Sequence, residues 1–158
     1  MKIAKEPGLL LDIMKEHEEV ISRLYECYAE KFAEHRDFWT ELSEEEIEHA
    51  NWIDTLRSRI EEGADVMVAD RFPIEAIKCS IDFVNKQIKK AADANFSLIN
   101  ALSTAIDIEK GLIDSKYFEV FEGDSKETAC TMALLARSTK EHYQRIRRMW
   151  QKHQVNVT

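Results

Sequence analysis

The sequence has few of the residues that interrupt helices. It contains 4 glycines and 2 prolines in 158 residues, while 44% of the residues are hydrophobic and 33% are charged. Sheet-rich and loop-rich folds need more turn residues, so this composition predicts a mostly helical protein. The length suits one domain that buries its own core, and we expect a single domain over residues 1–158.

Cysteine is scarce as well. The three cysteines, Cys27, Cys79 and Cys130, lie far apart, and none belongs to a Cys-x-x-Cys pair. A disulfide framework or a zinc ribbon needs paired cysteines, so neither is predicted. We expect a reducing, cytoplasmic environment.

Long hydrophobic runs are also missing at the start of the chain. The stretch MKIAKEPGLLLDIMKEH has an apolar run that Asp12 interrupts, too short for a signal peptide or a membrane span. We therefore expect a soluble protein without a membrane partner. The formal charge of -8 argues against a nucleic-acid partner. We interpret one basic cluster as complementing the dipole at a helix C-terminus; it comprises Arg145, Arg147, Arg148 and Lys152.

Apolar residues that recur every three or four positions predict four long helices. Their boundaries, accurate to about 2–4 residues, are Pro7–Ala33, Asp37–Glu62, Ser97–Phe121 and Ser125–Trp150. The segment from Ala64 to Ala94 connects the second helix to the third. Within it, Phe72-Pro73-Ile74 is expected to open a further amphipathic helix through Ile77, Ile81, Val84 and Ile88.

Connection lengths predict the topology. Short turns join the first two helices and the last two, so each pair should form an antiparallel hairpin. A helix of about 25 residues is about 38 Å long, and the central connection is long enough to run back along it. We predict an all-α fold, a four-helix bundle with one long, partly helical crossover connection.

Charged residues or histidines interrupt the apolar stripe of each of the four long predicted helices. In the stretch SEEEIEHANW, Glu46 and His49 share a helix face with apolar residues. Glu18, Glu109 and His142 occupy similar mid-helix positions in the other three helices. Any one of them alone is better explained as a slightly rotated surface residue or as a buried histidine bonded to a carbonyl. Their coincidence at one height favours a shared site.

Buried carboxylates that face one another need a counter-charge. An unpaired buried carboxylate costs several kcal/mol, and neighbouring carboxylates raise one another's pKa until they take up protons. A divalent cation removes this conflict. Nitrogen and oxygen donors together suit iron, manganese or zinc, whereas magnesium and calcium prefer oxygen alone. The sequence predicts a metal site formed by Glu18, Glu46, His49, Glu109 and His142.

The pattern occurs twice: Glu18 precedes Glu46-x-x-His49 by 28 residues, and Glu109 precedes Thr139-x-x-His142 by 30. Four stretches carry a wider likeness: LYECYAEKF, FWTELSEEEIEHANWI, ALSTAIDIEKGLI and LARSTKEHYQRI. On these residues the sequence resembles the ferritin-like superfamily, and more closely its rubrerythrin-like branch, over nearly the whole chain. The resemblance implies a ferritin-like bundle that holds two iron ions.

The resemblance also implies a role for each residue. Glu18 would be the terminal ligand of one iron, Glu46 a bridging carboxylate and His49 the imidazole of the first iron, with Glu109 and His142 the corresponding ligands of the second. It further implies reduction of peroxide or dioxygen and a homodimer. No rubredoxin-like cysteine pairs are present, so an enzyme of this kind would need a separate electron donor.

Thr139 departs from the family pattern, because the family has the second bridging glutamate at this position. We interpret its hydroxyl as bonding to the carbonyl four residues earlier. Four carboxylates neutralise two divalent ions, whereas three leave one positive charge, so two, one or no bound ions stay open. The alternative function is a degenerate bundle that acts as a sensor, scaffold or interaction module. No catalytic residue is assigned.

Overall fold

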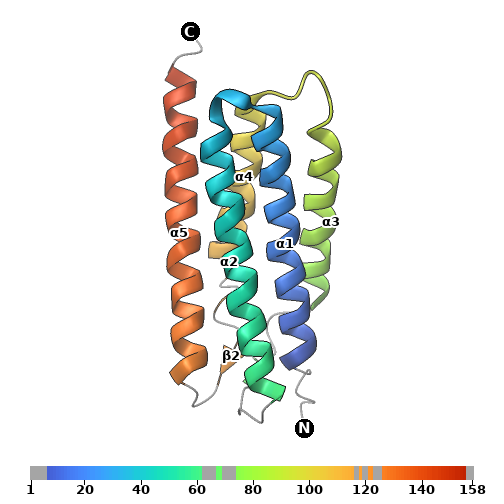
Figure 1. Ribbon diagram of the computed structural model, residues 1–158, viewed down its shortest axis with the longest axis vertical. Coiled ribbons are helices and arrows are strands. Elements are labelled where there is room, and N and C mark those ends of the chain that lie inside the picture. Colours follow the sequence, from blue (N-terminus) through green and yellow to red (C-terminus); the bar gives the residue numbers. More distant parts are fainter. Residues whose placement is uncertain are drawn as a thin grey trace.

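The computed structural model describes residues 7–61, 67–68, 74–115, 118, 121–122 and 126–155. Within these ranges, five α-helices run side by side along the long axis of the molecule (Figure 1). They are α1 (Pro7–Lys31), α2 (Arg36–Glu61), α3 (Ile74–Lys90), α4 (Leu98–Asp114) and α5 (Lys126–Val155), and a short 3-10 helix η1 (Ala33–His35) joins α1 to α2. The predicted all-α class is confirmed.

The helices associate mainly as neighbours in the sequence. Extensive contacts join α1 to α2 and α4 to α5, and each pair is antiparallel (Figure 1). Helix α3 packs along α1 and returns the chain from the end of α2 to the beginning of α4. The connection predicted between Ala64 and Ala94 thus contains the expected helix, although Phe72 and Pro73 lie outside the described residues.

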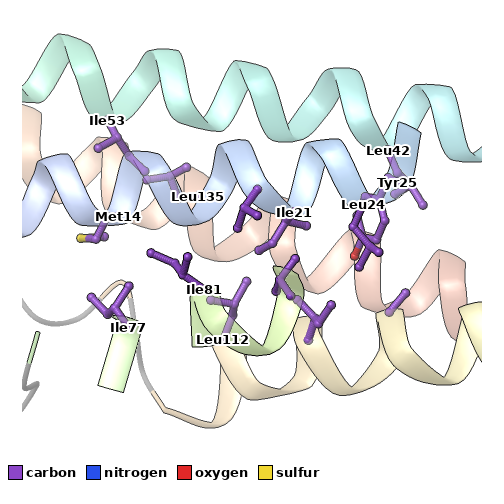
Figure 2. Packing of buried hydrophobic residues seen from close by; sticks show 14 of the residues in the cluster. Met14, Ile21, Leu24, Tyr25, Leu42, Ile53, Ile77, Ile81, Leu112 and Leu135 are labelled. Atoms are coloured by element: carbon purple, nitrogen blue, oxygen red, sulfur yellow. The ribbon is translucent and has the colours of Figure 1, made fainter. Parts of the chain in front are cut away.

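One hydrophobic core runs between the helices. Figure 2 shows side chains from all five helices meeting in it, among them Ile21, Ile53, Ile77, Leu112 and Leu135. Each of these side chains is at most 5% exposed. Because apolar residues recur at helical spacing, each helix presents an apolar stripe to this core. Burial of these stripes, rather than helix propensity, holds the elements together.

Two small residues link α1 and α2 inside the core. The Ser22 hydroxyl donates to the Ser43 carbonyl at 2.9 Å, and the Ser43 hydroxyl lies 3.0 Å from the Ser22 carbonyl. The two hydroxyl oxygens are 2.8 Å apart. Since both side chains are buried, this reciprocal bonding fixes the height of α1 against α2.

Two predicted helix ends are wrong. The third predicted helix, α4, ends at Asp114 and not at Phe121, because Phe121–Glu122 forms a short strand β2. Strand β2 pairs antiparallel with β1 (Met67–Val68), and this pairing requires extended backbone. The last helix continues past Trp150 to Val155. None of the helices in the described ranges combines the length and the apolar character needed to cross a bilayer.

Candidate metal centre

Four helices bring the five predicted ligands into the protein interior. All five side chains are at most 1% exposed; they are Glu18 on α1, Glu46 and His49 on α2, Glu109 on α4 and His142 on α5, and we call them the Glu–His cluster. The neighbouring Glu44 and Glu48 are exposed. Helix α2 therefore directs only part of its acidic stretch inward, as its 3.6-residue period dictates.

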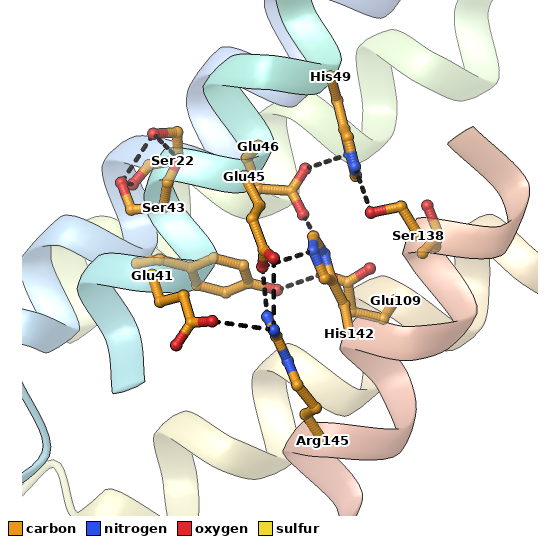
Figure 3. Close-up of polar contacts among 12 residues, drawn as sticks. Ser22, Glu41, Ser43, Glu45, Glu46, His49, Glu109, Ser138, His142 and Arg145 are labelled. Carbon is orange, nitrogen blue, oxygen red and sulfur yellow. Dashed lines mark hydrogen bonds and ion pairs between the residues drawn. The ribbon is translucent and has the colours of Figure 1, made fainter. Parts of the chain in front are cut away.

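Glu46 lies between the two histidines of the cluster (Figure 3). Its Oε1 is 2.8 Å from Nδ1 of His142, and its Oε2 is 3.4 Å from Nδ1 of His49. The two imidazole rings stack at 5.1 Å between centroids. Donor atoms of these three residues all lie within 4.8 Å of one another, close enough to hold one metal ion.

Glu18 lies next to His49, and Glu109 lies next to His142. Oε2 of Glu18 lies 3.8 Å from Nδ1 of His49, and Oε1 of Glu109 lies 3.6 Å from Nδ1 of His142. Nδ1 of each imidazole therefore faces two carboxylates, one of which is Glu46 in both cases. The cluster consists of two similar halves that share Glu46.

Several polar atoms of the cluster are buried without a hydrogen-bond partner. They are both carboxylate oxygens of Glu18, Oε2 of Glu46, Nδ1 of His49, Oε2 of Glu109 and Nε2 of His142. Buried polar atoms are nearly always hydrogen-bonded in folded proteins, so a concentration of exceptions needs an explanation. A cation inside the cluster would compensate the carboxylate oxygens and Nδ1 of His49, and this set of oxygen and imidazole donors fits a transition metal.

The outward-facing nitrogens of the two histidines have different neighbours. Nε2 of His49 lies 2.7 Å from the hydroxyl oxygen of Ser138. Nε2 of His142 lies 3.1 Å from Oε2 of Glu45, an ion-pair distance without the alignment of a hydrogen bond. Arg145 in turn binds the Glu45 carboxylate. Charged partners of this kind hold an imidazole in one orientation.

These three outer residues were not predicted. Their only sequence signal is spacing: Glu45 precedes Glu46, while Ser138 and Arg145 lie about one helical turn before and after His142. The interpretation of Arg145 as a helix C-terminal charge is wrong. Helix α5 runs on to Val155, and Arg145 pairs instead with glutamates of α2.

Burial and charge shift the pKa values of the cluster. Burial, reinforced by the charge of Glu46, raises the pKa of Glu18 to about 7. The pKa of Glu46 is lowered: burial and Glu109 oppose this, but contacts with Glu18, His49 and His142 outweigh them. Burial also opposes protonation of the imidazoles, yet the carboxylates raise the pKa of His49 to about 10 and that of His142 to about 12. Without metal, protonated imidazoles balance the carboxylates, so an incoming ion must displace protons.

Thr139 is buried beside the cluster, and its hydroxyl is already occupied. Oγ1 donates to the carbonyl oxygen of Leu135 at 2.8 Å, which confirms the predicted bond to the residue four positions earlier. A neutral hydroxyl engaged in this way replaces neither the charge nor the two oxygens of a bridging glutamate. The cluster therefore contains three carboxylates.

His17 and Asp107 do not belong to the Glu–His cluster. Nε2 of His17 lies 2.8 Å from the hydroxyl oxygen of Ser80 on α3. Both His17 and Asp107 line a separate cavity of about 250 Å³, together with residues of α3. Their side chains thus lie beside α3, although each is close in sequence to a residue of the cluster.

Comparison of the chain with protein-family models, with curated proteins and with solved structures gives no match. The chemistry of the site therefore follows from its own donor atoms. A buried Glu/His/His group with two flanking carboxylates is compatible with metal binding.

Proposed function

We propose that this protein binds a transition metal ion between its helices, with iron as the favoured metal, at the Glu–His cluster. The observation that carries the proposal is the meeting of Glu46, His49 and His142, with donor atoms within 4.8 Å of one another in a buried interior. Mixed imidazole and carboxylate donors select iron, manganese or zinc over magnesium or calcium.

The two halves of the cluster support a site for up to two ions. Glu46 directs one oxygen toward each histidine, which is the arrangement a bridging carboxylate needs. In this proposal Glu18 and His49 complete one position, and Glu109 and His142 complete the other. The likeness to rubrerythrin-like proteins of the ferritin-like superfamily favours the same assignment, as does the α3 crossover between two helical hairpins.

The chemistry we propose is reduction of peroxide or dioxygen, for which bound iron would supply the electrons. The chain's own part is to hold donor atoms in fixed positions and to exclude bulk water, since the cluster residues are at most 1% exposed. Reduction of peroxide to water consumes two electrons and two protons. The oxidised iron would have to be reduced again. The chain has no paired cysteines for this purpose, since Cys27, Cys79 and Cys130 are all free, so a separate electron donor is part of this proposal.

Metal content tests the binding proposal. Protein purified without chelator should contain metal, and the double variant Glu46→Ala, His49→Ala should lose it, because the shared carboxylate and one imidazole are removed. A matched double variant, Glu44→Ala, Glu48→Ala, alters exposed glutamates of the same helix and should keep the metal content of the unaltered protein. Negligible metal in all three proteins would refute the proposal.

A second candidate function is a ferritin-like module with one metal ion or none, acting as a sensor or scaffold. The bond between Thr139 and Leu135 favours it, because the fourth carboxylate is missing. Anaerobic addition of ferrous iron followed by peroxide separates the two functions. Rapid oxidation of two ferrous ions per chain supports the reductase. Tight binding without peroxide-dependent oxidation supports the module.

A further inference from the structure

The two imidazoles of the Glu–His cluster differ in what holds their outer nitrogen (Figure 3). Nε2 of His49 faces the neutral hydroxyl of Ser138 at 2.7 Å, whereas Nε2 of His142 faces the carboxylate of Glu45 at 3.1 Å. A carboxylate at the outer nitrogen retains the ring proton there and leaves the inner nitrogen as a stronger electron-pair donor. A hydroxyl does this less effectively.

Glu45 is itself held in place. Arg145 binds both of its carboxylate oxygens and also lies 3.4 Å from Oε1 of Glu41. A two-point contact between a guanidinium and a carboxylate fixes the carboxylate plane as well as its position. The Glu45 and Arg145 side chains are 33% and 29% exposed, so the pair lies at the edge of the bundle and spans from solvent to His142.

The inner nitrogen of His142 has matching neighbours. Nδ1 lies 2.8 Å from Oε1 of Glu46 and 3.6 Å from Oε1 of Glu109. With Glu45 on one side of the ring and these two carboxylates on the other, both ring nitrogens face a carboxylate. Nδ1 faces the cluster and Nε2 faces Glu45. A proton that Glu45 holds on Nε2 therefore leaves the electron pair of Nδ1 available to an ion.

We propose that Glu45 is a positioning residue that orients His142 and strengthens it as a metal ligand. This inference rests on the proposed metal-binding function. Ser138 does the same for His49 more weakly, so the two halves of the cluster bind metal unequally, and the half that contains His142 is the stronger one.

Cobalt(II) affinity tests the inference, because its visible absorption also reports the ligand set. Glu45→Gln keeps the shape of the side chain and removes its charge, and it should weaken cobalt(II) binding by about 10- to 100-fold in competition with a chelating dye. Glu44→Gln, an exposed neighbour on α2, should bind as the unaltered protein does. Ser138→Ala should weaken binding less than Glu45→Gln.

Folding is measured separately by thermal unfolding in excess chelator. If Glu45→Gln does not fold, Arg145→Gln carries the test, because it leaves Glu45 in place without its anchor and should still weaken cobalt(II) binding by about tenfold. Unchanged affinity in the folded variant would overturn the inference, and so would an equal loss in Ser138→Ala. If either outcome is found but the unaltered protein binds cobalt(II), only this inference fails and the proposed metal-binding function stands. No cobalt(II) binding at all would end both.

Discussion

The hydroxyl of Tyr25 on α1 donates a 2.8 Å hydrogen bond to Oε1 of Glu109 on α4. Both side chains are fully buried, and the same carboxylate oxygen lies 3.6 Å from Nδ1 of His142. Burial and the charge of Glu109 raise the pKa of Tyr25 well above its ordinary value, so the phenol remains a donor over the whole physiological range. One tyrosine therefore fixes a carboxylate of the cluster from the neighbouring hairpin.

Replacing Tyr25 by phenylalanine should destabilise the metal-free protein. The change removes the donor and leaves Oε1 of Glu109 with less compensation in a buried position, at a cost of about 1–3 kcal/mol. Urea denaturation in excess chelator measures the free energy of unfolding. Tyr143→Phe, a half-exposed tyrosine on α5, is the control and should change it by less than about 0.5 kcal/mol. Equal stability of the two variants would contradict the structural role of Tyr25.

Thr139→Glu should increase the number of metal ions bound per chain. The substitution adds a fourth carboxylate beside the three of the cluster, at the position where the resemblance places the second bridging glutamate. In the metal-free state the added charge is buried, so we also expect a loss of several kcal/mol of stability in chelator. Thr139→Val removes the hydroxyl without adding charge and should leave the stoichiometry unchanged. If Thr139→Glu only destabilises the fold, then this face of α5 is not part of the site.

The metal-free protein should become less stable as the pH rises from about 5 to about 10. In the folded protein Glu18 keeps its proton up to about pH 7, whereas its ordinary pKa is 4.5. Its contribution to the free energy of unfolding is therefore fully present below pH 4.5 and is lost as the pH rises through 7. His49 contributes fully below pH 6.5 and loses this contribution as the pH passes about 10. The lowered pKa of Glu46 acts below pH 4.5, outside this window.

His142, whose pKa is raised to about 12, acts in the same direction as Glu18 and His49, so the free energy of unfolding should fall continuously across this range. Chemical denaturation at a series of pH values in chelator measures it. Glu18→Gln should flatten the curve between pH 5 and pH 7 and keep the fall above pH 7. A wild-type stability that rises across this range would show that the cluster is not protonated as described.

Ser22 and Ser43 should be energetically coupled. Each hydroxyl donates to the carbonyl of the other residue, so removing either one deletes a buried hydrogen bond between α1 and α2. We expect Ser22→Ala and Ser43→Ala to cost about 1–2 kcal/mol each, and the double variant to cost less than their sum by about 1 kcal/mol. A double-mutant cycle from urea denaturation gives this coupling energy. Strict additivity would mean that the hydroxyls act independently.

The sequence predicts the helices and the interior positions of the cluster because both depend on local periodicity. Glu46 and His49 share a stripe with Leu42 and Ile53, and a 3.6-residue repeat places all four on one face. The bond from Thr139 to Leu135 is predictable for the same reason, since both groups lie on one helix turn. Whether the cluster binds a metal stays a prediction.

Contacts between distant helices are harder to predict. The pairing of Glu45 with His142 and Arg145 depends on how α2 and α5 are rotated and shifted against each other, and no spacing rule within one helix contains that information. The end of α4 at Asp114 was missed for a similar reason. Phe121 continues an apolar helical pattern, but pairing with Val68 in a distant segment imposes extended backbone there.

The cluster is complete only when the two hairpins have docked. Glu18, Glu46 and His49 belong to the first hairpin, α1 with α2, and Glu109 and His142 belong to the second, α4 with α5; close approach of α2 to α5 is limited. Local hairpin contacts form quickly, and the N-terminal hairpin leaves the ribosome first, with these three polar side chains still in water. Only docking of the second hairpin encloses them. Capture of an ion would therefore mark the last stage of folding and distinguish a finished molecule from a half-assembled one.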